Sequence, residues 1–135
     1  MVRYAARRTF AAAVLACTAL AMASPAWPQT NRIEAAFNEL ERQSRTGKGE
    51  YAEALVGMIH AYEVANVELE TVRKQPVLYC LPEVGAFDYT LLAFITVGEY
   101  RANKSLYDKA GAEPLTLMSM ALLKGLQSAF KCKGP

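Results

Sequence analysis

The sequence predicts an all-α fold, a compact domain of four to five helices that one disulfide staples together. Apolar residues recur at spacings of three and four through most of the chain, which is the period of a helix with one buried face. Prolines and glycines interrupt this pattern and separate the expected helices. Cys80 and Cys132 remain after an export signal, and an oxidising compartment favours their pairing.

The N-terminus has the three parts of a secretory signal peptide. A few arginines precede an unbroken run of apolar and small residues over 10–22, and an A-x-A cleavage pattern ends at Ala23. We expect residues 1–23 to be removed, with a second possible cut after Ala26. Cys17 leaves with the signal. The expected location of the exported chain is the periplasm.

Removal of the signal changes the charge balance. The whole chain has 15 Lys and Arg against 13 Asp and Glu, but three of the arginines belong to the signal. The exported chain therefore has one more acidic than basic side chain, which gives no electrostatic reason to expect nucleic acid or an anionic membrane as a partner. Residues 24–31 indicate a loose, proline-containing leader, and 32–135 have the length of a single domain.

The first two helices have continuous apolar stripes. We expect one helix over 32–44, with Thr30 or Asn31 as its cap, and the glycines within 46–49 end it. Its stripe consists of Ile33, Ala36, Phe37 and Leu40. The second helix ends before Pro76, because proline disfavours the helical conformation of the residue before it. The inward face of this helix is predicted to be Leu55, Met58, Tyr62, Ala65, Leu69 and Val72.

A third helix is expected over 88–102, after an irregular connection over 76–84 that the disulfide pins. Its inward residues are predicted to be Leu91, Phe94, Ile95 and Gly98. Further apolar residues make the helix apolar nearly all round, so it is either the most buried helix or part of a dimer contact. The β-branched and aromatic run 94–97 leaves a strand as the alternative for that part.

The chain ends with a polar connection and a last helix. Residues 103–111 are expected to form a loop or a short helix in which Tyr107 is exposed. The last helix covers 114–130 and begins with Pro114, a residue suited to the first helical position. Its inner stripe is predicted to be Leu115, Met118, Leu122, Gly125, Leu126 and Ala129.

No pattern in the exported chain predicts catalysis, a metal site or a cofactor. His60 is its only histidine, and cysteines paired with each other are not available as metal ligands. No carboxylate is placed to orient His60 toward a serine, and the glutamates of the second helix form a solvated face. We therefore expect a protein that is not an enzyme.

Two kinds of polar residue need their own explanation. Asn66 lies beside the inner stripe of the second helix, although asparagine is a poor helix former. We expect its amide to be partly buried and hydrogen-bonded to the carbonyl of a neighbouring loop. Most of the tyrosines are expected to bury the ring and leave the hydroxyl in water. Tyr100 and Tyr107 flank the polar connection, and we expect them instead on a recognition surface.

Three segments together carry a family resemblance. They are the run 51–66, the motif Leu78-Tyr79-Cys80-Leu81-Pro82 and the close Ala129-Phe130-Lys131-Cys132. In this order they resemble the Rap1a/Tai family of small periplasmic proteins, over roughly residues 50–133. Two departures are that Lys131 stands where the family commonly has proline, and that no glutamine occurs between Leu81 and Ala112.

The resemblance implies a helical, often dimeric immunity protein that binds and blocks a peptidoglycan amidase effector, or another toxin, of type VI secretion. Exposed polarity mixed with tyrosine then predicts two partner-binding segments. The first segment, 99–113, contains Glu99, Tyr100, Tyr107, Asp108 and Glu113. The second, 83–89, contains Glu83, Asp88 and Tyr89. The alternatives are a periplasmic acid-stress chaperone and a housekeeping domain of the same fold.

Overall fold

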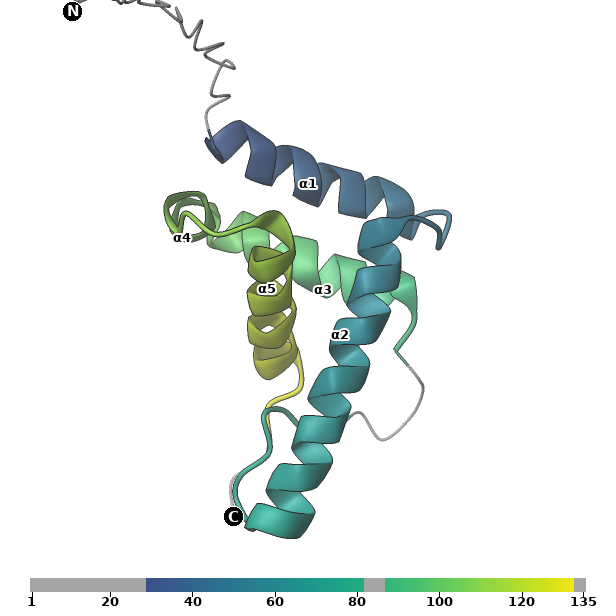
Figure 1. Ribbon diagram of the computed structural model, residues 1–135, viewed down its shortest axis with the longest axis vertical. Helices are drawn as coiled ribbons and strands as arrows, with labels where there is room; N and C mark the ends of the chain where they lie inside the picture. Colours follow the sequence, from purple (N-terminus) through teal and green to yellow (C-terminus); the bar gives the residue numbers. More distant parts are fainter. Residues whose placement is uncertain (1–28, 82–86, 133–135) are drawn as a thin grey trace, which may run out of the picture.

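The computed structural model describes residues 29–81 and 87–132, which form an all-α fold. The helices in chain order are α1 (Gln29–Ser44), α2 (Glu50–Val67), the π-helical segment η1 (Glu68–Arg73), α3 (Tyr89–Ala102), α4 (Lys104–Lys109) and α5 (Pro114–Ala129). In Figure 1, α1 and α3 run across the upper part of the molecule, and α2 and α5 run downward. The predicted fold class is confirmed, and 94–97 is helical rather than a strand.

The core lies where α1 and α5 pack against α3. The pair α3 and α5 has the most extensive contact, followed by α1 and α3. The side chains with no accessible surface are Phe37, Leu40, Leu55, Leu92, Thr96, Leu117, Met118, Ala121, Leu122 and Leu126. All four residues of the stripe predicted for the first helix are buried, which confirms that face.

The start of α1 differs from the prediction. The helix begins at Gln29, so the end of the expected leader is helical, and Thr30 and Asn31 lie within the helix instead of capping it. The predicted signal peptide and residues 24–28 lie outside the described residues.

α3 and α5 approach closely at Gly125. A Cβ atom at this position would lie 3.0 Å from the backbone oxygen of Ile95, and nearer still to the Ile95 side chain. The missing side chain therefore allows the two helices to pack at this distance. Gly125 is buried, as predicted.

The buried face of α3 differs from the predicted face. Leu91, Phe94 and Gly98 are exposed, and Phe94 retains 75% of its accessible surface. The buried residues of α3 are Leu92, Ala93, Ile95, Thr96, Val97 and Tyr100. Because α3 is apolar nearly all round, its sequence pattern does not distinguish the side that α1 and α5 cover.

The buried face of α5 contains Met118, Leu122, Gly125 and Leu126 of the predicted stripe and extends beyond it. Leu115 and Ala129 are exposed, whereas Leu117 and Ala121 are fully buried. α5 packs against α2 as well as α3, so its contact surface is wider than one stripe and turned toward both neighbours.

α2 continues into η1, which changes the phase of its side chains. Glu68 and Arg73 form an ion pair at 2.8 Å across five positions, a separation that the wider π turn brings together. Lys74 then adopts a left-handed backbone with φ 52°, and the helix ends before Pro76 as predicted. The prediction that Val72 faces inward is wrong, since the side chain is 73% exposed. The α-helical period no longer applies at that point.

The connection after η1 is held by the buried amide of Asn66. Its Nδ2 donates to the carbonyl of Tyr79 at 3.0 Å, and its Oδ1 accepts from the N–H of Leu78 at 2.7 Å. Asn66 is only 6% exposed. The expectation of a buried amide satisfied by a loop carbonyl is therefore confirmed, and Asn66 also accepts a second bond from the same loop.

The predicted disulfide between Cys80 and Cys132 is present, with the two Cα atoms 5.0 Å apart. Next to it, the N–H of Cys80 donates to the carbonyl of Phe130 at 2.9 Å. The ring of Phe87 packs edge-on against Phe130 and against Tyr79, with centroids 5.5 and 6.3 Å apart. These contacts join the connection to the end of α5.

We predict that Asn66→Ala lowers the free energy of unfolding by about 2 kcal/mol, because a backbone donor and a backbone acceptor lose their partner together. Urea unfolding followed by circular dichroism measures this loss. Asn38→Ala is the matched control, since Asn38 is exposed on α1 and should tolerate the change. Equal effects of the two substitutions would contradict the role of the Asn66 amide.

A second prediction concerns the crossing of α3 and α5. Gly125→Ala should destabilise the fold by about 1–3 kcal/mol, because the added methyl group overlaps Ile95. Gly57→Ala is the matched control: a Cβ on Gly57 meets nothing within 4 Å, and alanine in a helix should stabilise by about 0.5–1 kcal/mol. Thermal unfolding should therefore shift in opposite directions for the two variants. A shift in the same direction for both would contradict the prediction.

Candidate partner-binding groove

The larger of the two cavities described on the surface is an open groove of about 810 Å³. Residues of α1 and of the first turns of α2 and α5 line it: Asn31, Arg32, Ala35, Ala36, Glu39, Glu50, Tyr51, Glu113, Pro114 and Leu115. This volume lies in the range of ligand-binding clefts, about 300–1,000 Å³. The groove is therefore large enough for several side chains of a partner.

The groove combines apolar and acidic residues. Glu39, Glu50 and Glu113 are its acidic residues, and Arg32 is its only basic one. Arg32 pairs with Glu113 at 2.7 Å, and both side chains are well exposed, so this pair contributes little to stability. Among the described residues, Glu50 has no ion-pair or hydrogen-bond partner. Because Glu39 is also paired, with Arg42, the unpaired carboxylate of Glu50 beside apolar residues is the feature that favours a partner with basic and apolar side chains.

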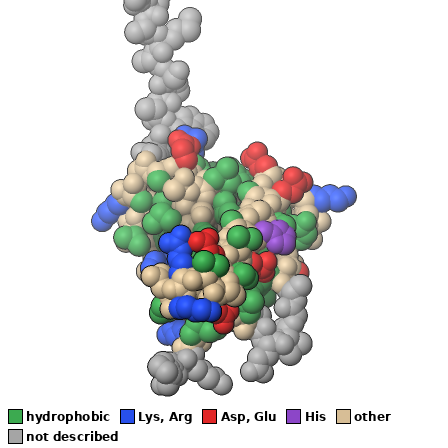
Figure 2. Space-filling view, turned by 60° about the horizontal axis from the view of Figure 1, so that its bottom comes forward, with side chains coloured by type: hydrophobic (Ala, Val, Ile, Leu, Met, Phe, Trp, Pro, Cys, Tyr) green, Lys and Arg blue, Asp and Glu red, His purple; other side chains and the backbone are tan. Residues whose placement is uncertain are grey.

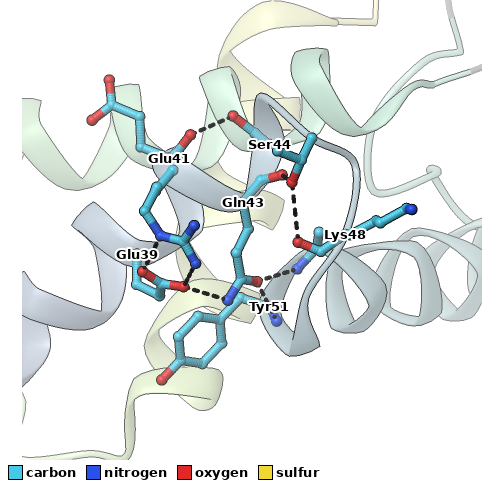
Figure 3. Close-up of polar contacts among 9 residues, drawn as sticks. Glu39, Glu41, Gln43, Ser44, Lys48 and Tyr51 are labelled. Atoms are coloured by element: carbon cyan, nitrogen blue, oxygen red, sulfur yellow. Dashed lines mark hydrogen bonds and ion pairs between the residues drawn. The ribbon is translucent and has the colours of Figure 1, made fainter.

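Gln43 of α1 positions the side of the groove formed by α2 (Figure 3). Its Oε1 accepts from the N–H groups of Tyr51 and Ala52 at 2.9 and 3.2 Å, and its Nε2 donates to Glu39 at 2.9 Å. Gly49 occupies the N-cap position of α2, with φ 129° and no side chain, so Gln43 supplies the missing cap from the preceding helix. The buried amide thereby links the two helices.

The charge of Glu39 is strongly stabilised. Hydrogen bonds from the Arg42 guanidinium, at 2.7 Å from Nε, and from Gln43 lower the pKa of Glu39 to about 2. Because the folded-state pKa is below the ordinary value of 4.5, this carboxylate stabilises the fold above pH 4.5. That contribution is lost as the pH falls from 4.5 toward 2.

Two of the predicted partner-binding residues are in the core. Tyr100 and Tyr107 are 3% and 1% exposed, so the expectation that their rings are exposed is wrong. The ring of Tyr100 stacks on Phe37 at 4.0 Å between centroids, and Tyr107 packs beside both rings. Burial raises the pKa of both tyrosine hydroxyls. The polarity of 103–111 did not reveal that α4 turns Tyr107 inward.

Glu99 and Asp108 accept hydrogen bonds from these buried tyrosines. Tyr107 donates to Glu99 at 3.2 Å and Tyr100 donates to Asp108 at 3.1 Å. Lys104 pairs with Asp108 at 2.5 Å, and this contact raises the pKa of Lys104. These predicted site residues therefore hold α3 and α4 together. Of the first segment, only Glu113 lines the groove.

The second predicted segment lies at the other end of α3. Asp88 caps this helix, because its Oδ1 accepts from the N–H of Leu91 at 2.8 Å. Tyr89 is 36% exposed and lies near Gly47. Glu83 lies outside the described residues. Tyr89 and Glu99, where the two predicted segments face each other along α3, are ten residues and therefore roughly 15 Å apart, so the segments do not form one site.

His60 lies on the surface in Figure 2, with its Nδ1 3.3 Å from Glu63 of the same helix. In the part of the chain that the structure describes, no three His, Cys, Asp or Glu residues gather into a possible metal site. A search of the same part for a helix that is long and apolar enough to span a membrane found none.

We predict that Gln43→Ala destabilises the fold by about 1–2 kcal/mol, because the first turn of α2 loses its cap. The pKa of Glu39 should rise from about 2 but stay below 4.5, since Arg42 provides the largest lowering. Carboxyl ¹³C NMR during a pH titration measures the pKa. Gln127→Ala, a change on α5 away from this junction, should leave both quantities as they are. An unchanged Glu39 pKa in Gln43→Ala would contradict the conclusion that the hydrogen bond from Gln43 helps to lower this pKa.

Comparison with known proteins found no matching family model, no similar curated protein and no similar solved structure. The resemblance to the Rap1a/Tai family therefore stays a prediction from the sequence motifs.

Proposed function

We propose that this chain is a periplasmic immunity protein that binds and blocks a peptidoglycan-degrading amidase effector. The main support is the groove of about 810 Å³, in which apolar side chains lie beside the unpaired carboxylate of Glu50. A second support is the resemblance of residues 50–133, whose two cysteines are joined in a disulfide. Such a role requires binding and no catalysis of its own.

The groove is the proposed contact surface. Leu115, which is 47% exposed, and Ala35 provide apolar surface that a partner can cover. Glu50 provides a carboxylate that is not engaged with another described residue. We infer that the effector inserts a segment with an apolar side chain next to a Lys or Arg, because such a segment matches both features. Occlusion of the effector would follow from the bulk of the domain around this contact.

The scaffold is suited to this role because hydrogen bonds from a buried side chain hold one wall of its groove. The cap from Gln43 fixes the first turn of α2, which forms one wall of the groove. A groove whose walls are already ordered loses less conformational entropy on binding than a mobile loop does.

The test is binding and inhibition of amidase effectors produced by the same cell. The exported chain should copurify with one of them and block its hydrolysis of peptidoglycan. Ala35→Arg and Leu115→Arg should weaken this binding by about 30-fold or more, since each puts a bulky charge into the groove. Leu106→Arg is the matched control: Leu106 is 63% exposed on α4, outside the groove, and should bind as the unchanged chain does.

Two outcomes would contradict parts of this proposal. If no effector bound, and the chain instead suppressed the aggregation of other proteins at acid pH, the chaperone alternative would replace the immunity role. If an effector bound the unchanged chain and both groove variants with the same affinity, the proposed function would stand and the groove would be the wrong surface.

A further inference from the structure

The two halves of the disulfide differ in their exposure to solvent. Cys132 is exposed, and so is Lys131, the residue before it. Cys80 is half-buried, and its backbone N–H donates to the carbonyl of Phe130. Exposed disulfides are the labile ones among secreted proteins, because exchange with another thiol requires access to a sulfur atom. The sulfur of Cys132 is therefore the one that an incoming thiol reaches more easily.

The connection that contains Cys80 is also held by contacts that do not involve sulfur. Asn66 makes two hydrogen bonds to the backbone of this connection, at 2.7 and 3.0 Å. The ring of Phe87 packs edge-on against Phe130, with the centroids 5.5 Å apart. Breaking the bond between the two sulfur atoms leaves each of these contacts in place. The chain can therefore stay folded when the disulfide opens.

We propose that Cys132 is an exchange site through which a dithiol oxidoreductase reduces the disulfide of the folded chain. Such an enzyme presents one reactive thiolate and a second thiol close behind it. The thiolate needs an exposed sulfur, which Cys132 provides beyond the end of α5 at Ala129. The positive charge of the neighbouring Lys131 favours the approach of a negatively charged thiolate.

The exchange takes place in two steps. The thiolate of the oxidoreductase attacks Sγ of Cys132, so that a bond between the two proteins forms while the bond to Cys80 breaks. Cys80 leaves as a thiolate and takes a proton from water. The second thiol of the oxidoreductase, as its thiolate, then attacks the mixed disulfide and releases Cys132, which is protonated in turn. The chain gains two electrons and two protons, and the oxidoreductase becomes a disulfide.

The exchange site is distant from the groove. The groove is lined by Pro114 and Leu115 at the start of α5, whereas Cys132 lies beyond the other end of this helix (Figure 1). The 16 residues of α5 separate the two by roughly 20 Å or more. Reduction therefore leaves the lining of the groove unchanged, and the proposed exchange does not depend on the immunity function.

The first experiment measures how fast dithiothreitol reduces the exported chain in native buffer, with alkylation of the released thiols and mass spectrometry as the readout. Gln43→Ala is the diagnostic variant, because it removes the cap of α2 and leaves the surroundings of the disulfide unchanged. Direct attack on the folded chain predicts a rate within about twofold of that of the unchanged chain. A bond that opened only on global unfolding would be reduced about 5- to 30-fold faster in this variant, because its unfolded population rises by that factor.

The second experiment identifies the sulfur that is attacked. A thioredoxin whose second active-site cysteine is replaced by serine cannot complete the exchange, so the mixed disulfide accumulates. After alkylation and digestion, thioredoxin should be found on Cys132 at least about tenfold more often than on Cys80. Circular dichroism of the fully reduced, alkylated chain should still show its helices.

Each of three results would overturn the proposal. The first is a reduction rate that rises in Gln43→Ala as the unfolded population does. The second is an adduct that forms mainly on Cys80, and the third is a reduced chain that has lost its helices. Neither experiment contains an effector, so these results are independent of whether the immunity function is correct.

Discussion

The contacts that hold residues 78–80, called the clamp below, are the constraint on which the lower half of the fold depends. Asn66 binds the backbone on both sides of the peptide that joins Leu78 to Tyr79, and the disulfide then ties Cys80 to Cys132. A cross-link across 52 residues contributes about 4 kcal/mol by restricting the unfolded chain. Because only a short chain leads from Cys80 to α3, the clamp also limits where α3 enters the core.

A second buried amide, that of Gln43, fixes the other end of α2 in the same way. Gln43 accepts hydrogen bonds from two N–H groups in the first turn of α2, and Asn66 hydrogen-bonds to the loop that follows η1. Each amide comes from one element and serves another, so each fixes the position of two elements at once. A buried amide is stable only when it is fully bonded, which restricts both junctions to one arrangement. The groove is lined by residues next to the Gln43 junction, Glu39 and Tyr51, so this junction helps to define it.

Much of the local structure could be predicted, and the candidate site could not. Asp88 and Pro114 mark the starts of α3 and α5 in sequence and in space. Glu113 is the one predicted contact residue that lines the groove. The other lining residues come from three separate helices and look like ordinary helix surface in the sequence. Tyr107 was missed because polar neighbours surround it in the chain, while an aromatic core surrounds it in the fold.

The sequence by itself determined most of the helical segments, the starts of α3 and α5, the stop before Pro76 and the cysteine pair, because these follow from local physics: the helical period, the fixed φ of proline and the pairing of two thiols. Only the tertiary structure decided which face of α3 is buried and how far the buried face of α5 extends. α3 is apolar on nearly every side, so the choice between burying Leu92 and burying Phe94 rests on how α1 and α5 pack against it. The cap of α2 was likewise decided in three dimensions, since its acceptor, Gln43, belongs to another helix.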